Sequence, residues 1–140
     1  MMIIFDKDYD SVKQEDIENL EKLIGSELPE DYKQHMLKYN GGSIPLWYEY
    51  IFIHNKRELS LEGFHQLKYG DDNVESYFGH KHDFLYPNLL PIGAITGGYI
   101  AMGYQQENKG EIYVYFSDED PYKIANSFNE FIEGIEVREI

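Results

Sequence analysis

Residues Ile17–Gly42 read IENLEKLIGSELPEDYKQHMLKYNGG and decide how the first third of the chain folds. Within this stretch, Gly25 can end a helix in a left-handed conformation that a side chain would oppose. Pro29 suits the first turn of a second helix, because the N–H that proline lacks would have no partner there. The sequence Asn40-Gly41-Gly42 then stops that helix. The stretch therefore predicts two helices and the turns that connect them.

Each of the two predicted helices has an apolar face. Ser11 has capping-box spacing to Gln14, which predicts that Ser11 caps the first helix. Glu30 and Asp31 follow the proline and place negative charge at the positive end of the second helix. Helical spacing predicts a buried face on the first helix made by Ile17, Leu20, Leu23 and Ile24. The buried face of the second helix is predicted to be Tyr32, Met36, Leu37 and Tyr39.

The composition bounds the class of protein. With 140 residues, the chain is expected to form one domain, 1–140, with a hydrophobic core of its own. The absence of cysteine excludes disulfides, thiolate metal sites and cysteine nucleophiles, and is compatible with a reducing cytoplasm. The amino terminus has no secretory signal, and no apolar stretch approaches the ~20 residues needed to span a bilayer. We therefore expect a soluble, cytoplasmic protein.

The formal net charge of −14 bears on the choice of partner. Such a field repels phosphate backbones and anionic membranes, so we expect no direct binding to nucleic acid or to a membrane. It attracts a basic protein and accelerates the encounter with it. On composition alone, the simpler interpretation is that acidity keeps the chain soluble. The 13 tyrosines exceed what a core of this size needs, and tyrosine is enriched at protein interfaces.

After the two helices, the sequence predicts mostly strands. Ile44–Ile53 is rich in aromatic and β-branched residues and predicts a strand, with Pro45 near its start or edge. His54–Gly63 is polar, with a few apolar residues, and predicts a loop or short helix. Phe64–Phe78 predicts two weak strand-like runs around a turn at Gly70-Asp71-Asp72-Asn73.

The clearest strand signals form a hairpin in the second half of the chain. Tyr99–Tyr104 and Ile112–Phe116 flank Asn108-Lys109-Gly110, which is typical of a turn between antiparallel strands. The apolar run Leu89–Ile95 precedes them across a turn at Gly97-Gly98. The sequence therefore predicts an antiparallel hairpin of Tyr99–Tyr104 and Ile112–Phe116.

The carboxyl-terminal segment predicts a short helix. Ser127 has capping-box spacing to Glu130. The apolar side chains that would pack this helix on the sheet are Phe128, Phe131, Ile132 and Ile135. Two helices, then strands, then a helix predict an α+β fold.

The order of these motifs resembles the SUKH superfamily. The first two helices carry that family's glutamate, glycine, LPxxY step and closing NGG. Leu89–Gly93 with Gly97, Ile112–Asp120 and Ser127–Ile135 resemble its later segments, so the resemblance covers nearly the whole chain. One departure is Gly98, where many members carry aspartate. The signature positions, which we interpret as structural, are Gly25, Leu28, Pro29, Tyr32, Asn40, Gly41, Gly42, Gly93, Gly97, Phe128 and Phe131.

The resemblance implies a fold and a class of function. It implies a mostly antiparallel sheet of about five or six strands, flanked by two amino-terminal helices and a carboxyl-terminal helix. Bacterial members are mostly immunity proteins of polymorphic toxin systems, each neutralising a toxin domain, frequently a nuclease. The resemblance therefore implies a non-catalytic antitoxin. Its acidic field would complement the basic surface with which a nuclease holds nucleic acid.

Two other classes of function stay open. Fungal members of the family include cell-wall assembly regulators that act as interaction hubs, so a regulatory scaffold with several partners is the alternative. An enzyme with an unrecognised carboxylate or histidine site is the third class. No nucleophile elbow and no phosphate-binding glycine motif in the sequence points to one. We expect no catalytic residue, no cofactor and no bound metal.

A histidine cluster, His80-Lys81-His82-Asp83, lies in a loop predicted over Gly79–Tyr86. In an extended chain, His80 and His82 would face one side and could share a metal ion. No third ligand completes the set of three or four that a metal site needs. We interpret these residues as exposed loop histidines.

Charge and aromatic content suggest where a partner would bind. The turn at Asp118 and Glu119 is expected to be exposed, with the acids at Gly70–Asn73 as a second acidic lip. Alternate side chains of the strand after NGG face outward, whereas Trp47 is expected to pack in the core. The predicted partner-binding residues are therefore Asp118, Glu119, Asp71, Asp72, Tyr48 and Tyr50.

Overall fold

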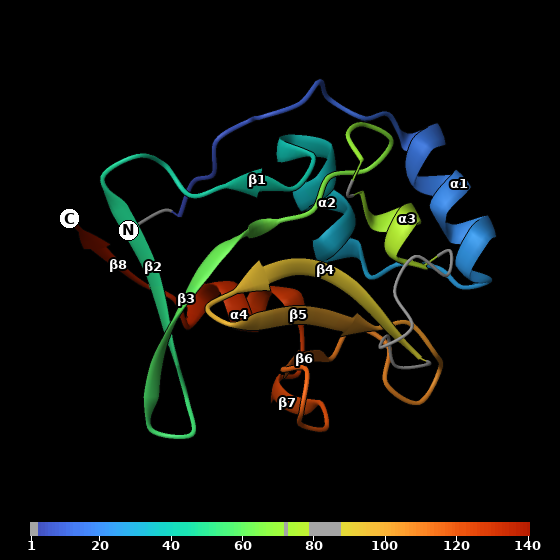
Figure 1. Cartoon of the computed structure of the whole chain (residues 1–140). Helices are drawn as coiled ribbons and strands as arrows, with labels where there is room; N and C mark the ends of the chain where they lie inside the picture. Colours follow the sequence, from blue (N-terminus) through green and yellow to red (C-terminus); the bar gives the residue numbers. More distant parts are fainter. Residues whose placement is uncertain (1–2, 72, 79–87) are drawn as a thin grey trace.

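The quoted stretch folds as two helices in the computed structural model, which describes residues 3–71, 73–78 and 88–140 (Figure 1). Helix α1 spans Gln14–Ile24 and ends at Gly25, whose φ of 74° is left-handed. Helix α2 spans Glu30–Tyr39 and ends at Asn40, with a φ of 46°. Pro29 is the residue just before α2 rather than part of its first turn. Both predicted helices and both predicted stops are confirmed.

Two details of α1 differ from the prediction. Ser11 does not cap the helix; the N-cap is Lys13, whose backbone N–H donates to Asp16 Oδ2 at 2.9 Å. The carboxylate of Asp16 thus accepts the N–H of Lys13, as the predicted box had Gln14 accept the N–H of Ser11. Leu23 is 49% exposed, so its predicted burial is wrong. The buried side of α1 is the narrower stripe Ile17, Leu20 and Ile24.

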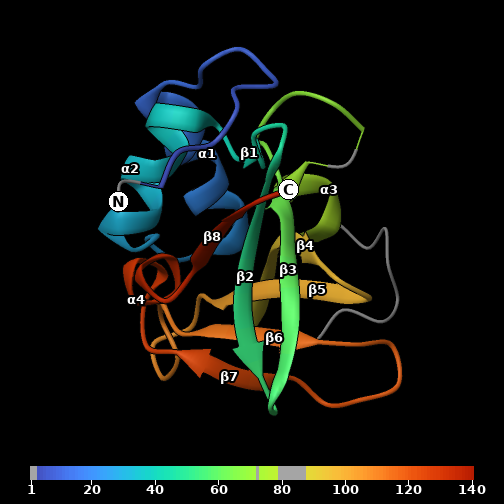
Figure 2. The ribbon, with the colours of Figure 1, turned by 90° about the vertical axis from the view of Figure 1, so that its left-hand side faces the viewer.

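An antiparallel sheet follows, and the described residues give it eight strands, more than the five or six expected. The strand order is β7-β6-β5-β4-β3-β2-β8, with β1 paired to β3. In Figure 2 the β2–β3 hairpin runs across the direction of β6 and β7, so the sheet is strongly curled. The strands are β1 (Gly42–Ser43), β2 (Tyr48–His54), β3 (Arg57–Phe64), β4 (Leu89–Ile95), β5 (Gly98–Gly103), β6 (Ile112–Tyr115), β7 (Tyr122–Ala125) and β8 (Glu136–Glu139).

Strand β3 corrects the loop or short helix predicted over His54–Gly63. A two-residue turn joins β2 to β3, and its residues Asn55 and Lys56 have φ of 54° and 65°. The turn pairs His54 with Arg57. Hairpin turns of this kind need two left-handed residues, a conformation that asparagine accepts more readily than lysine. Because lysine is not typical of this turn, the sequence did not predict it.

Helix α3, Val74–Phe78, corrects the strand-like runs predicted over Phe64–Phe78. Asn73 begins the helix, because its Oδ1 accepts the backbone N–H of Ser76 at 2.9 Å. A helix of five residues is too short to show a helical period in the sequence. Strands β7 and β8 have four residues each, which is too short for a clear alternation of apolar and polar residues. The sequence therefore did not predict them.

Helix α4, Phe128–Glu133, completes the core with α1 and α2 on one side of the sheet (Figure 2). It begins at Ser127, whose Oγ accepts the N–H of Glu130 at 3.0 Å, which confirms the predicted cap. Asp31 of α2 also binds this helix start: its Oδ2 accepts the N–H of Asn129 at 3.0 Å. The acid of the LPxxY step thus joins the first and last parts of the chain.

Candidate partner-binding surface

An extended segment before α1 carries acidic side chains across one end of the molecule. We call residues Asp6–Asp10, DKDYD, the acidic strap; it runs above β1 in Figure 1, and its three aspartates are exposed. The N–H of Asp6 donates to the carbonyl oxygen of Ser43 at 2.9 Å. The hydroxyl of Ser43 donates to Asp8 Oδ1 at 3.1 Å. Strand β1 therefore fixes the course of the strap.

Asn40 clamps the strap from the protein interior. Its side chain is 1% exposed, and its Nδ2 donates to the carbonyl oxygens of Asp10 and Leu67, each at 3.2 Å. Its Oδ1 accepts the N–H of Leu67 at 2.8 Å. Buried polar groups of this kind are costly to leave unpaired. One side chain of the NGG motif thus ties the strap to the loop after β3.

The two glycines of NGG allow backbones to meet at the same place. A Cβ on Gly41 would lie 2.7 Å from the carbonyl oxygens of Phe64 and His65. A Cβ on Gly42 would lie 2.8 Å from the Cβ of Phe5. Both glycines also have left-handed φ, of 90° and 105°. The motif forms the site on which the strap rests.

Next to the strap, the turn between β1 and β2 exposes large apolar side chains. Leu46 is 74% exposed, Trp47 67% and Tyr48 39%; we call these three residues the aromatic tip. Ile140, itself 75% exposed, donates its N–H to the carbonyl oxygen of Trp47 at 2.8 Å and extends this surface. The expectation that Trp47 packs in the core is wrong. A turn at residues 46–47 interrupts the strand and carries the indole outward.

The backbone of Trp47 is held in an unfavourable conformation. Its φ is 76°, in the left-handed region that costs a residue with a Cβ about 1–2 kcal/mol. The hydrogen bond from Ile140, and one from Tyr48 N to Pro45 O at 3.2 Å, hold the turn in this shape. Neither packing nor conformational preference explains an exposed indole at this position. Strain of this kind is typical of functional sites.

Tyr50 does not belong to the exposed surface, which corrects its prediction as a partner contact. It is 2% exposed, and its hydroxyl donates to the carbonyl oxygen of Ile4. Burial raises the pKa of this hydroxyl above its usual value. Tyr48 and Tyr50 lie on the same face of β2, but Tyr48 is exposed at the start of the strand, whereas Tyr50 packs against Phe5 in the core. It supports the chain just before the strap.

Of the other predicted contacts, Asp71 lies near the strap. Tyr9 of the strap stacks on Tyr69, with ring centroids 6.5 Å apart, and Lys68 Nζ lies 5.5 Å from the centroid of the Tyr69 ring. Asp71, which is exposed, follows Tyr69 by two residues. Tyr48 and Asp71 are therefore at the same end of the molecule as the strap.

Asp118 and Glu119 lie at the opposite end. The turn between β6 and β7 is at the bottom of Figures 1 and 2, whereas the strap is at the top of both. We call Asp118–Asp120 the acidic turn; all three residues are exposed, and so is Tyr122 nearby, at 62%. The structure therefore does not bring the predicted partner residues together on one face.

Some predicted residues lie outside the described part of the chain: Asp72, and the cluster His80-Lys81-His82-Asp83. Among the residues that are described, no group of three or more His, Asp and Glu side chains could hold a metal ion. Within the same residues, no helix has the length and apolar character to cross a membrane.

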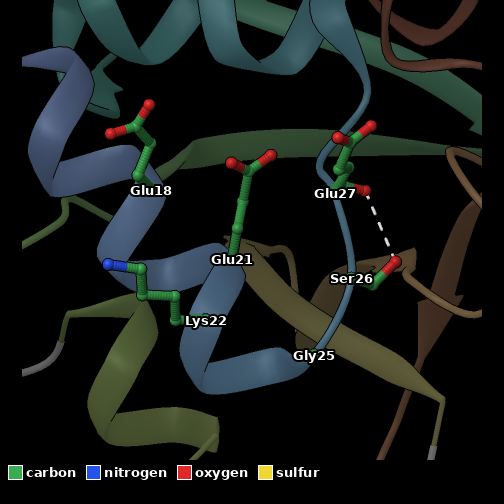
Figure 3. Close-up of a pocket in the computed structure, with 6 residues that line it drawn as sticks. All are labelled: Glu18, Glu21, Lys22, Gly25, Ser26 and Glu27. Atoms are coloured by element: carbon green, nitrogen blue, oxygen red, sulfur yellow. Dashed lines mark hydrogen bonds between the residues drawn. The ribbon is translucent and has the colours of Figure 1, made fainter.

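A shallow hollow of about 450 Å³ extends the acidic surface onto α1 (Figure 3). Glu18, Glu21 and Glu27 line it, and their carboxylates point toward α2. Glu21 is engaged in the helix junction: its Oε2 accepts the N–H of Leu28 at 2.8 Å and pairs with Lys33 Nζ at 3.1 Å. The bond to Glu21 raises the pKa of Lys33. Glu18 and Glu27 stay exposed.

Comparison with known proteins agrees with these motifs. The sequence model of the SMI1 / KNR4 family (SUKH-1) matches residues 11–134. This chain belongs to the SUKH-1 family. It is also similar to YokK, an uncharacterised protein derived from the SPbeta prophage of Bacillus subtilis (strain 168). The two are 29% identical, over an alignment that covers 84% of this chain and 71% of the relative.

The departure of this SUKH-1 chain at Gly98 has a steric reason. A Cβ on Gly98 would lie 2.5 Å from the carbonyl oxygen of Tyr115 and 2.7 Å from Cδ1 of Phe116. The aspartate of the motif would therefore require β6 to shift away from β5. Any role that this aspartate has in other members is not carried at this position.

Sequence reasoning missed two parts of the surface, the strap as a unit and the apolar residues Leu46 and Trp47. The alternating acids at Asp6, Asp8 and Asp10 were counted in the charge but not assigned to a site. For Leu46 and Trp47, the available signal was Pro45, which can interrupt a strand just before them.

Proposed function

We propose that this SUKH-1 protein is a non-catalytic immunity protein that binds and neutralises a cognate basic toxin domain, such as a nuclease, in the cytoplasm. The observation that carries the proposal is Trp47, an exposed indole fixed in a strained turn beside the acidic strap. Tryptophan and tyrosine are the residues that most often anchor protein interfaces. Neighbouring carboxylates steer a basic partner toward such an anchor.

The charge distribution supports a basic partner for the chain. Residues 1–31 hold ten acidic and three basic residues, a net charge of −7, which is half of the −14 of the whole chain. This part of the sequence includes the strap and the exposed acids of α1. A toxin that holds nucleic acid presents a complementary basic surface. The family supports the same proposal, since its bacterial members are mostly immunity proteins.

Co-expression tests the proposal. The toxin to use is the variable carboxyl-terminal domain of a long secreted protein encoded in the neighbouring reading frame. We expect co-expression of this chain to rescue cells from that domain, and the two proteins to purify as a complex. Failure to rescue contradicts the immunity role. Capture of several unrelated endogenous proteins, in place of one toxin, indicates the regulatory scaffold instead.

A pair of variants tests the anchor. We expect Trp47→Ala to weaken the complex by about 30-fold or more, mainly through faster dissociation, as truncating an interface hot spot does. Leu23→Ala removes an exposed apolar side chain of α1, away from the aromatic tip, and is the control. Equal dissociation rates for Trp47→Ala and the unaltered protein contradict the assignment of Trp47 as the anchor.

A further inference from the structure

A pocket of about 360 Å³ lies between β2, β7 and α4, toward the other end of β2 from the aromatic tip. Figure 2 shows how these three elements are arranged. Apolar side chains in its walls come from Phe52, Ile53, Ile124, Ala125 and Phe131, and polar atoms share the lining. Such a lining suits a group that has both an apolar and a polar part.

The rim of the pocket carries apolar side chains that folding leaves exposed. Ile53, which lines the pocket, is 62% exposed, and so is Tyr122 at the start of β7. The ring of Tyr122 packs edge-on against His54, with centroids 4.9 Å apart, so β2 and β7 are held together at this end. The pocket and its rim form an apolar surface that is separate from the aromatic tip.

One charged side chain, Glu130, stands among the described residues that line the pocket. An acid in the first turn of α4 is favoured by the helix dipole, but that does not require it to join an apolar wall. No described residue forms an ion pair or hydrogen bond with its carboxylate. Lys123, the cation of β7, is paired with Glu111 at 2.7 Å. The carboxylate is therefore available to a cation from outside.

We infer that this pocket binds a peptide segment of a partner protein in which a large apolar side chain is adjacent to a cationic one. The apolar side chain enters between Phe52, Ile124 and Phe131, and the cation pairs with Glu130 at the wall. This site is independent of the proposed function, because it uses none of the residues of the strap or the tip.

Capped dipeptides test this inference without a known partner. The probes are N-acetyl-Leu-Arg-amide, N-acetyl-Leu-Glu-amide and N-acetyl-Gly-Arg-amide, titrated at millimolar concentration into the ¹⁵N-labelled full chain. We expect saturable shifts of the amides of Phe52, Ile53, Ile124 and residues 130–134 with Leu-Arg. We expect N-acetyl-Leu-Glu-amide to bind about fivefold more weakly, the upper range for one exposed ion pair. N-acetyl-Gly-Arg-amide should bind about tenfold more weakly, the lower range for burying a leucine side chain.

Two variants make the inference falsifiable. Glu130→Gln should reduce the preference for Leu-Arg over Leu-Glu, whereas Glu133→Gln, which alters an acid of the same helix outside the pocket lining, should keep it. The same spectra report whether each variant is folded. Equal shifts with all three probes, or shifts located elsewhere, overturn the inference. Trp47→Ala should leave the dipeptide titration unchanged, so failure here is distinguishable from failure of the immunity role.

Discussion

The acidic strap and the acidic turn carry the same kind of charge in different structural settings. The strap is fixed along its length by Asn40 and Ser43, and it lies beside the exposed Trp47. The turn is a link between two strands, with Glu119 N donating to Phe116 O at 3.2 Å. Counting acids does not separate the two segments. What separates them is that residues distant in sequence hold the strap in place, at the end of the molecule that carries the aromatic tip.

The NGG motif has a second structural role besides ending helix α2. Asn40 and the two glycines after it form the seat of the strap. A family motif that is structural in its own contacts can therefore fix the position of the candidate surface.

Glycine substitutions should show the largest difference between the seat of the strap and other turns. Gly41→Ala places a Cβ 2.7 Å from two carbonyl oxygens at a φ of 90°. We expect it to lower the free energy of unfolding by about 4 kcal/mol, from left-handed strain plus overpacking. Gly97→Ala has a similar φ of 73° with no atom within 4 Å, and should cost about 1 kcal/mol. Urea unfolding measures both, and equal losses contradict the crowding at Gly41.

The amide of Asn40 should matter next. Asn40→Gly keeps the left-handed backbone accessible but removes the clamp, leaving the buried N–H and carbonyl of Leu67 without this partner. We expect a loss of about 3 kcal/mol in the free energy of unfolding. Hydrogen exchange should also quicken in residues 5–12. Asn108→Ala is the control, since its amide bonds lie in a more exposed loop. A strap that exchanges at the same rate in Asn40→Gly and wild type would show that Asn40 does not hold it.

Acid should weaken the seat of the strap through His35. Its Nε2 is 2.7 Å from Gly41 O, its ring packs on Phe5, and burial lowers its pKa from 6.5 to about 4. Between these two values the unfolded chain binds a proton that the folded chain excludes, so the free energy of unfolding falls as the pH is lowered. The loss should approach about 3 kcal/mol at pH 4.

The His35→Phe variant isolates this effect. It keeps an aromatic ring among Phe5, Phe64 and Phe128 but has no proton to bind. We expect the free energy of unfolding of this variant, measured by urea at pH 7.0, 5.5 and 4.5, to depend less steeply on pH than that of the wild type. The same pH dependence in both proteins contradicts the assignment to His35.

The parts of the fold that sequence reasoning predicted are those with local signals. The stops at Gly25 and Asn40, the hairpin of β5 and β6, and the Ser127 cap each depend on residues within a few positions of one another. The β2–β3 turn was not predicted, because Lys56 takes a conformation that its residue type disfavours.

The candidate surface could not be predicted in the same way. The bond from Asn40 to Asp10 joins residues 30 positions apart, and the bond from Ile140 to Trp47 joins the start of β2 to the chain beyond β8. These contacts depend on the order of strands in the sheet. The sequence therefore indicated the charge and the aromatic content of the surface. The tertiary fold decides which acidic and aromatic residues lie close to one another.

The most direct test of the account compares charge reversals in the strap and in the turn. Asp6→Lys with Asp10→Lys, and Asp118→Lys with Glu119→Lys, each change the net charge from −14 to −10. The bonds that fix the strap use Asp6 N and Asp10 O, so both double variants should stay within about 0.5 kcal/mol of wild-type stability. Matched net charge leaves position as the difference between them.

The measurement is the association rate with the toxin domain over a range of salt concentrations. At low salt, we expect the strap variant to associate about tenfold more slowly than the wild type and to show a flatter salt dependence, because local carboxylates steer the approach of a basic partner. The turn variant should lose much less. An association rate that falls equally in both variants, or more in the turn variant, contradicts the claim that the partner binds at the strap and the aromatic tip.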